Sequence, residues 1–205
     1  MSEYSQIQTY IKSNPEIFKD VIKQFAEVLN SLGLDSKYFT TEQDWELLHT
    51  LWVGGEAEEQ LFNNDGYQLH IRPYVTGWAP EERKELQDIW LEVSLLFLTV
   101  DIENRIGQLK DEHKALIWVM INKFSKEFKE SGVYFTNEAT DGRPWEALIC
   151  GEKEGMWEFD AAILPRYLSH KYEVYPTEMF FNINENTIFV ARKSLWKSEP
   201  WLKID

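Results

Sequence analysis

The sequence contains almost no cysteine: Cys150 is the only one among its 205 residues. The chain therefore cannot form an internal disulfide, and such cysteine usage is typical of proteins from a reducing compartment. Residues 1–6 also lack the basic segment and following apolar run that mark a signal peptide. We therefore expect a cytoplasmic protein.

Positive charge is scarce as well. The chain has 21 Lys and Arg residues against 35 Asp and Glu residues, which gives a formal net charge of −14. Nucleic acids and anionic membrane surfaces bind proteins through clustered Lys and Arg, so we expect no nucleic acid and no membrane partner. The most apolar stretch, residues 89–100, contains Glu92 and Ser94 and is too short to span a bilayer.

The sequence also lacks a recognisable catalytic motif. It has no glycine-rich phosphate loop, no nucleophile elbow and no HExxH pair. No two of its four histidines lie three or four residues apart, as metal ligands on one helix would. Cys150 has no histidine near it in the sequence, so we expect it to pack as a small buried residue. We therefore predict no catalytic residue, no metal site and no cofactor.

Aromatic residues, in contrast, are abundant: they make up 15% of the chain, and nine of them are Trp. So much aromatic surface must be largely buried if the protein is not to associate. The strongest pattern is residues 79–100, where Pro80 and two following acidic residues are typical of a helix start. Apolar residues then recur at helical spacing. We predict a helix that buries one face: Leu86, Ile89, Trp90, Val93, Leu96, Phe97 and Val100.

Other segments before residue 132 mostly show helical patterns. Residues 7–32 predict one or two helices, residues 41–52 a further helix, and residues 110–130 a long helix. Residues 67–76 are the exception, because they alternate between apolar and polar side chains and predict a strand. Pro73 cannot donate a hydrogen bond to a neighbouring strand, so we expect this strand either to lie at a sheet edge or to end at Pro73.

From residue 133 the pattern changes to short strands. We predict them at residues 133–136, 145–150 and 157–164, followed by a hairpin of Met179–Ile183 with Thr187–Arg192. Because helices come first and strands later, we predict an α+β fold: a helical N-terminal half packed on a mainly antiparallel sheet formed by the C-terminal half. No linker divides the chain, so we predict a single domain over residues 1–205.

The turn around Asp141 and Gly142 contains the residues we select as a binding site. Arg143 and Trp145 combine a directed hydrogen-bond donor with a large aromatic face, a combination that is enriched at protein-binding hot spots. We predict that both residues contact a partner. The alternative is a turn whose Trp145 enters the core, as most tryptophans in loops do.

The leading functional hypothesis is an acidic protein-binding module, similar in general character to small inhibitor or immunity proteins. Its charge suits a basic protein partner, although a net charge of this sign also serves solubility alone. One alternative is an enzyme of unrecognised family with a pocket between helices and sheet. The other is an acidic mimic of nucleic acid.

Overall fold

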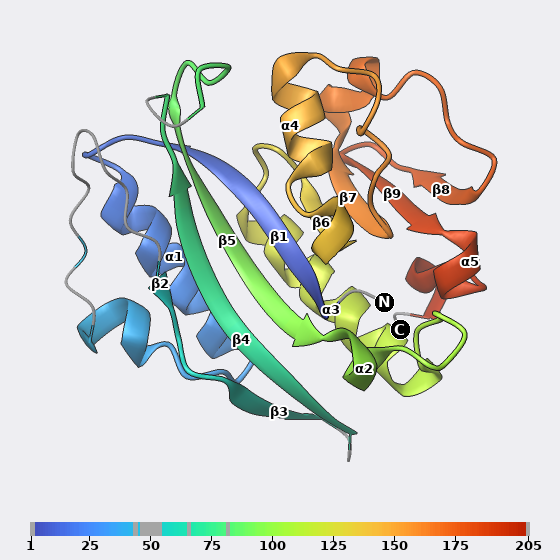
Figure 1. Ribbon diagram of the computed structural model, residues 1–205, viewed down its shortest axis with the longest axis horizontal. Coiled ribbons are helices and arrows are strands. Elements are labelled where there is room, and N and C mark those ends of the chain that lie inside the picture. The colour runs from blue at the N-terminus through green and yellow to red at the C-terminus, as the bar shows by residue number, and fades with distance from the viewer. Residues whose placement is uncertain (1–2, 43–44, 46–54, 65–66, 81–82, 204–205) are drawn as a thin grey trace.

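A computed structural model describes residues 3–42, 45, 55–64, 67–80 and 83–203 of the chain (Figure 1). Within these residues the strands form one antiparallel sheet in the order β2-β4-β5-β1-β6-β7-β9-β8, with β3 also paired to β4. The strands are β1 (Tyr4–Ser13), β2 (Gly55–Glu56), β3 (Gln60–Asn64), β4 (Tyr67–Trp78), β5 (Ile89–Leu98), β6 (Val133–Asn137), β7 (Ala161–Pro165), β8 (Met179–Ile183) and β9 (Thr187–Arg192).

Helices are distributed along the whole chain between these strands. The α-helices are α1 (Phe18–Ser31), α2 (Thr99–Ile102), α3 (Asp111–Glu127), α4 (Arg143–Cys150) and α5 (Lys193–Trp196). Four short helices of other types are a π-helix, η1 (Tyr38–Glu42), and three 3₁₀ turns, η2 (Glu138–Thr140), η3 (Arg166–Lys171) and η4 (Pro200–Lys203).

The prediction of a helical N-terminal half packed on a C-terminal sheet is therefore wrong. Both halves of the chain contribute strands to one sheet, and the N-terminal strand β1 lies in its middle, between β5 and β6. The apolar residues Ile7 and Ile11 are four positions apart, a spacing that puts them on one side of a helix and equally on one face of a strand. The pattern in this segment therefore did not distinguish the two structures.

The predicted helix over residues 79–100 is also wrong, since its second half is strand β5. Trp90 and Phe97 are buried as predicted, at 6% and 1% exposure, but they face opposite sides of the sheet. A strand that is buried on both faces has a nearly continuous apolar run, which matches a helical template as well as a strand template. β-branched and aromatic residues in this segment favoured the strand.

Two local predictions need a similar correction. Residues 145–150 belong to helix α4, which has Pro144 in its first turn and Gly151, at φ 72°, directly after its last residue.

Strand β4 is not an edge strand, because it pairs with β5 on one side and with β2 and β3 on the other. Pro73 is accommodated there because it lies in the gap between the residues paired with β3 and those paired with β2.

Several elements agree with the sequence predictions. Helix α3 lies within residues 110–130, α1 within residues 7–32 and strand β6 covers residues 133–136. The hairpin of β8 and β9 has the predicted bounds. The prediction for residues 157–164 is correct only from residue 161 onward. The predicted helix over residues 41–52 falls almost entirely outside the described residues.

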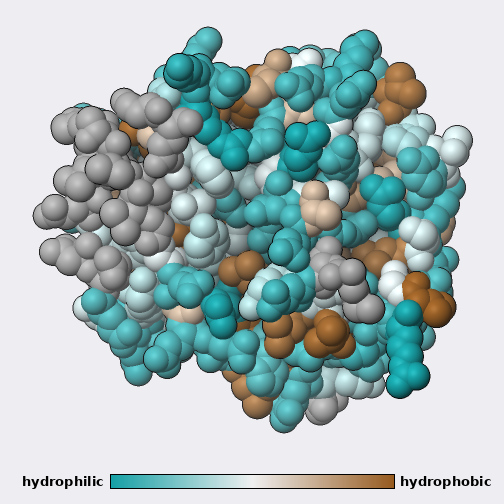
Figure 2. All heavy atoms as spheres, in the orientation of Figure 1, coloured by the Kyte–Doolittle hydropathy of each residue, from teal (hydrophilic) through white to brown (hydrophobic). Residues whose placement is uncertain are grey.

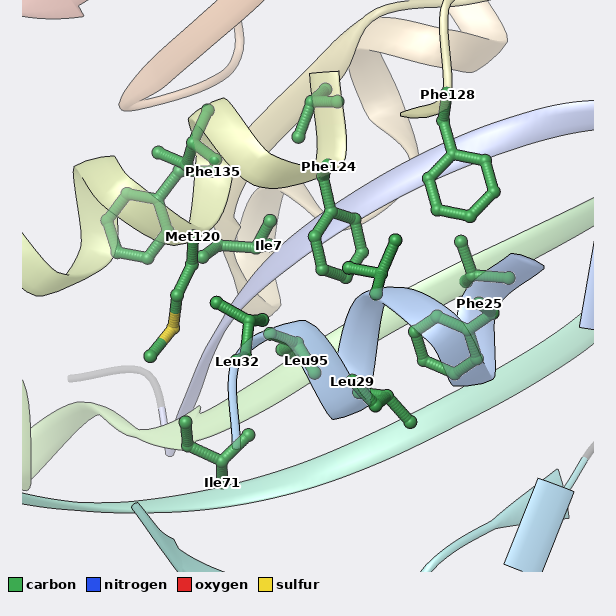
Figure 3. Packing of buried hydrophobic residues seen from close by; sticks show 14 of the residues in the cluster. Ile7, Phe25, Leu29, Leu32, Ile71, Leu95, Met120, Phe124, Phe128 and Phe135 are labelled. Carbon is green, nitrogen blue, oxygen red and sulfur yellow. The ribbon is translucent and has the colours of Figure 1, made fainter. Parts of the chain in front are cut away.

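One face of the sheet is apolar and is covered by α1 and α3, which lie behind β1, β5 and β4 in Figure 1. The close view in Figure 3 shows Leu95 of β5 beside Leu29 of α1, and Ile7 of β1 beside Met120 and Phe124 of α3. Phe124 of α3 packs edge-to-face on Phe25, with ring centroids 6.1 Å apart. This layer is the main hydrophobic core.

The opposite face differs in chemistry from one end to the other. Over β6, β7 and β9 it is apolar and carries α4, which packs through Ala147. Over β1, β5 and β4 the side chains that point to this face are largely polar or aromatic. Figure 2 shows this side of the molecule, where hydrophilic residues cover most of the surface. The candidate functional site lies here.

Candidate functional site on the second face of the sheet

A group of polar side chains occupies the middle of the second face, where an antiparallel sheet in contact with a core would place apolar ones. The register of β1 with β5 and β6 brings them together, and all strand members are at most 5% exposed. We call this group the polar cluster. Its members are Gln6 and Gln8 of β1, Glu92 and Ser94 of β5, Thr136 of β6 and Asp141 of the turn before α4.

Glu92 is the most unusual member, because a carboxyl group is 3% exposed in the centre of a sheet. The Ser94 hydroxyl donates to its Oε1 at 2.7 Å, and the Trp78 indole N–H donates to its Oε2 at 3.2 Å. Burial and the nearby charge of Asp141 raise the pKa of Glu92 to about 7, despite these donors. The group therefore changes charge near neutral pH.

Gln8 connects Glu92 to Asp141. In the amide orientation that satisfies its neighbours, the Gln8 nitrogen lies 3.2 Å from Glu92 Oε1 and 2.9 Å from Asp141 Oδ1, and the oxygen accepts from Thr136 Oγ1 at 2.8 Å. Gln6 donates a second hydrogen bond to Asp141 Oδ1. The turn at Gly142, with φ 68°, gives Asp141 this position at the end of the cluster.

In the part of the chain that the structure describes, the two carboxyl groups of the polar cluster form no ion pair. Among the described residues, no Lys, Arg or His nitrogen lies within 4.0 Å of an oxygen of Glu92 or Asp141. Burial and the charge of Glu146 raise the pKa of Asp141, while Gln6 and Arg83 lower it. Within the described ranges Glu92 is held away from water without an ion pair, which favours its protonated form, whereas Asp141 is exposed at the end of the cluster.

Aromatic rings border the polar cluster on the side of α4. Trp145 of α4 stacks on Tyr10 of β1 with ring centroids 4.3 Å apart and an interplanar angle of 6°. Trp90 and Trp78 approach the Trp145 ring at centroid distances of 5.7 and 6.4 Å. We call these four residues the aromatic wall. The Tyr10 hydroxyl, 2.8 Å from the Gln8 amide, joins the wall to the cluster.

A small cavity of about 190 Å³ adjoins the aromatic wall. Arg83, from the connection between β4 and β5, and Glu146 of α4 form an ion pair at its side. The Arg83 guanidinium also lies over the Trp78 ring, 4.4 Å from its centroid. Trp145 lines the cavity, and its indole N–H has no hydrogen-bond acceptor within the described part of the chain.

The two residues predicted to bind a partner are placed differently. The Arg143 side chain is 47% exposed, and its Nε donates to Glu158 Oε2 at 3.2 Å. Trp145 is 1% exposed and packs within the aromatic wall, so its ring is not presented at the surface. The structure therefore favours a Trp145 that enters the core, and a contact with a partner stays a prediction for both residues.

The residues of the polar cluster were missed in the sequence interpretation. In the sequence, Glu92 and Ser94 argue only against a membrane-spanning run, and Gln6 and Gln8 have no assigned role. The available signal was the alternation of polar residues with apolar ones in two segments, Gln6-Ile7-Gln8 and Glu92-Val93-Ser94. Polar residues on the same strand face in two neighbouring strands indicate a polar patch, provided that the strands are recognised.

Cys150 is exposed, so the expectation of a buried cysteine is wrong. It is the last residue of α4 and lines the same small cavity. Partial burial of the thiol, followed by the charges of Glu152 and Glu85, raises its pKa above the ordinary value. The thiolate is the reactive form, and a raised pKa makes it scarce at neutral pH.

We therefore expect Cys150 to react with the neutral reagent iodoacetamide more slowly at pH 7 than a cysteine in a short unstructured peptide. The rate should rise with pH until the thiol is ionised, and Glu152→Gln should shift this profile to lower pH because it removes a repelling charge. Mass spectrometry of the alkylated protein measures both rates. Equal rates for protein and peptide at pH 7 would contradict the raised pKa.

No group of three or more His, Cys, Asp or Glu residues in the described segments has the geometry to hold a metal ion. None of the helices in those segments is long and apolar enough to cross a membrane. No family model matches the chain, and no curated protein or solved structure matches it either.

Proposed function

We propose that this protein is a binding module, inhibitor- or immunity-like in character, that recognises a basic segment of a protein partner through the second face of its sheet. We assign the contact to the surface around Asp141 and Glu146, with Glu92 beneath it. The binding would take place in the cytoplasm, a reducing compartment that suits the single free thiol of Cys150.

One observation carries the proposal: Asp141 and Glu92 have no cationic partner among the described residues, although both are held in a hydrogen-bonded network. Asp141 is exposed and therefore open to a cation of a partner, and Glu92 beneath it adds negative charge when it is ionised. The aromatic wall beside them adds ring faces that attract cations. The net charge of −14 would draw a basic partner toward this surface from a distance.

Long-range attraction and direct contact should differ in their response to salt. Added salt shortens the Debye length, which is ~8 Å at physiological ionic strength, and so screens the distant charges of the approaching molecules. We expect the association rate to fall as salt rises while the dissociation rate changes little. Stopped-flow measurement of Trp fluorescence can follow both rates.

A hexa-arginine peptide is a suitable probe for the proposal. We expect Asp141→Asn to weaken its binding about tenfold in isothermal titration calorimetry, since the variant loses the most exposed unpaired carboxylate of the cluster. The matched control is Glu185→Gln in the turn between β8 and β9, which removes the same charge from an exposed position on a distant strand pair. Equal weakening by the two variants would show that only net charge matters and would overturn the proposed site.

The enzyme alternative is favoured by one observation. Glu92, with a pKa of about 7, can exist in both protonation states at neutral pH, as an acid–base catalyst must. It shares the Gln8 amide with Asp141, so two carboxyl groups of the site are coupled through one side chain. Mass spectrometry of the peptide after incubation distinguishes the two functions, because a binding module leaves the probe intact and a catalyst converts it.

A further inference from the structure

We propose that Trp78 and Glu146 form a seat for an arginine side chain of the basic partner, and that Arg83 of the chain itself occupies this seat when the partner is absent. The inference rests on the proposed function, because it specifies the chemistry of the partner residue that binds there. Arg83 would then be an internal competitor that the partner displaces.

The geometry of Arg83 matches the way proteins bind a guanidinium group. Its planar group lies over the Trp78 ring at 4.4 Å, and its Nη1 contacts Glu146 Oε1. A guanidinium can stack on an aromatic face and donate to a carboxylate in the same plane, whereas an ammonium offers only a point charge. The seat is therefore selective for arginine over lysine.

Arg83 is held weakly enough to leave. Its side chain is 36% exposed, and Glu146 is the only acidic residue that pairs with it in the described ranges. With Glu146 at 27% exposure the pair is partly open to water, which screens it, and two long side chains must be ordered to form it, so its contribution to stability is modest. Glu146 also lies 4.0 Å from Arg143 Nη1, so it would keep a cationic neighbour when Arg83 moves away.

The surroundings of the seat provide for a larger ligand than Arg83 alone. Asp141 feels the charge of Arg83, which lowers its pKa, yet the two residues form no ion pair within the described ranges. The adjoining cavity of about 190 Å³ gives room beside the seat.

The seat can be tested by titrating the protein with N-acetyl-arginine amide. Binding is followed by NMR through the indole N–H signal of Trp78, and the loss of that signal in Trp78→Phe assigns it. Only the fraction of molecules in which Arg83 has left the seat can bind the probe, so Arg83 lowers the apparent affinity by that fraction. Arg83→Gln should therefore bind the probe about tenfold more tightly than the wild type. The matched control is Lys84→Gln, an exposed neighbour that removes the same charge. N-acetyl-lysine amide should bind more weakly than the arginine probe to every variant.

Each outcome decides one point. No gain in Arg83→Gln, or an equal gain in Lys84→Gln, overturns the competitor role of Arg83. Tighter binding of free arginine than of the amide identifies a small-molecule site and overturns the assignment to a protein partner. The proposed function fails separately if hexa-arginine binds the wild type without dependence on Asp141, and circular dichroism confirms that each variant is folded.

Discussion

Trp145→Ala should lower the free energy of unfolding by about 3–5 kcal/mol, the loss expected when a fully buried tryptophan is truncated and leaves a cavity. Trp145 is 1% exposed, stacks on Tyr10 and contacts the ring of Trp90. The truncation therefore removes the centre of the aromatic wall and the main contact of α4 with β1. Urea denaturation measures the effect, with an unchanged m-value as evidence that the folded state is preserved.

Two matched variants separate packing from binding at this helix. Trp145→Phe keeps one aromatic ring on Tyr10 and removes the five-membered ring with its unpartnered N–H, so it should cost clearly less than Trp145→Ala. Arg143→Ala changes an exposed residue of the same helix and should leave the urea midpoint close to that of the wild type. If Trp145→Ala melts at the same urea concentration as Arg143→Ala, Trp145 does not hold this part of the core.

The second large effect is expected at Glu92. Its pKa is raised from 4.5 to about 7 in the folded protein, so folding favours the protonated form. The stabilisation from this proton is fully present below pH 4.5 and is lost as the pH rises through 7, because the unfolded chain ionises more easily. A shift of this size corresponds to about 3 kcal/mol.

Glu92→Gln should remove this pH dependence. The amide oxygen can accept from Trp78 and the amide nitrogen can donate to the Ser94 hydroxyl, so the variant keeps these two contacts and gives up the hydrogen bond from the Gln8 nitrogen. Relative to the wild type, its free energy of unfolding should improve by about 3 kcal/mol between pH 4 and pH 8. Denaturant melts across this range, with Glu185→Gln as an exposed control, measure the difference. Parallel profiles for wild type and Glu92→Gln would contradict the raised pKa.

The sequence identified helices and strands well where only one pattern fits. Helix α3 is amphipathic over 17 residues, which excludes a strand, and the β8–β9 hairpin has a short Asn-containing turn between alternating segments. It failed at β5 and β1, whose side chains are buried on both faces. Burial of both faces depends on what the rest of the chain places there, and local spacing does not contain that information.

The candidate site was harder to predict for the same reason. Gln6, Glu92 and Asp141 are far apart in the sequence, and only the pairing of β1 with β5 and β6 brings them together. A carboxyl group in an apolar run looks like a solvated position until both of its neighbouring strands are known. Trp145 shows the converse case: a tryptophan beside a polar turn can contact a partner or enter the core, and the structure shows it in the core.

The central position of β1 has a consequence for the synthesis of the protein. Its residues emerge from the ribosome well before those of its two partners, and the more distant one, β6, ends at Asn137. At about 5–20 residues per second, the wait for β6 is on the order of 10 s. During this time β1 and the strands already made expose unpaired backbone groups that can associate with other chains. We therefore expect the nascent chain to depend on chaperones until β6 has been made, after which the middle of the sheet can close.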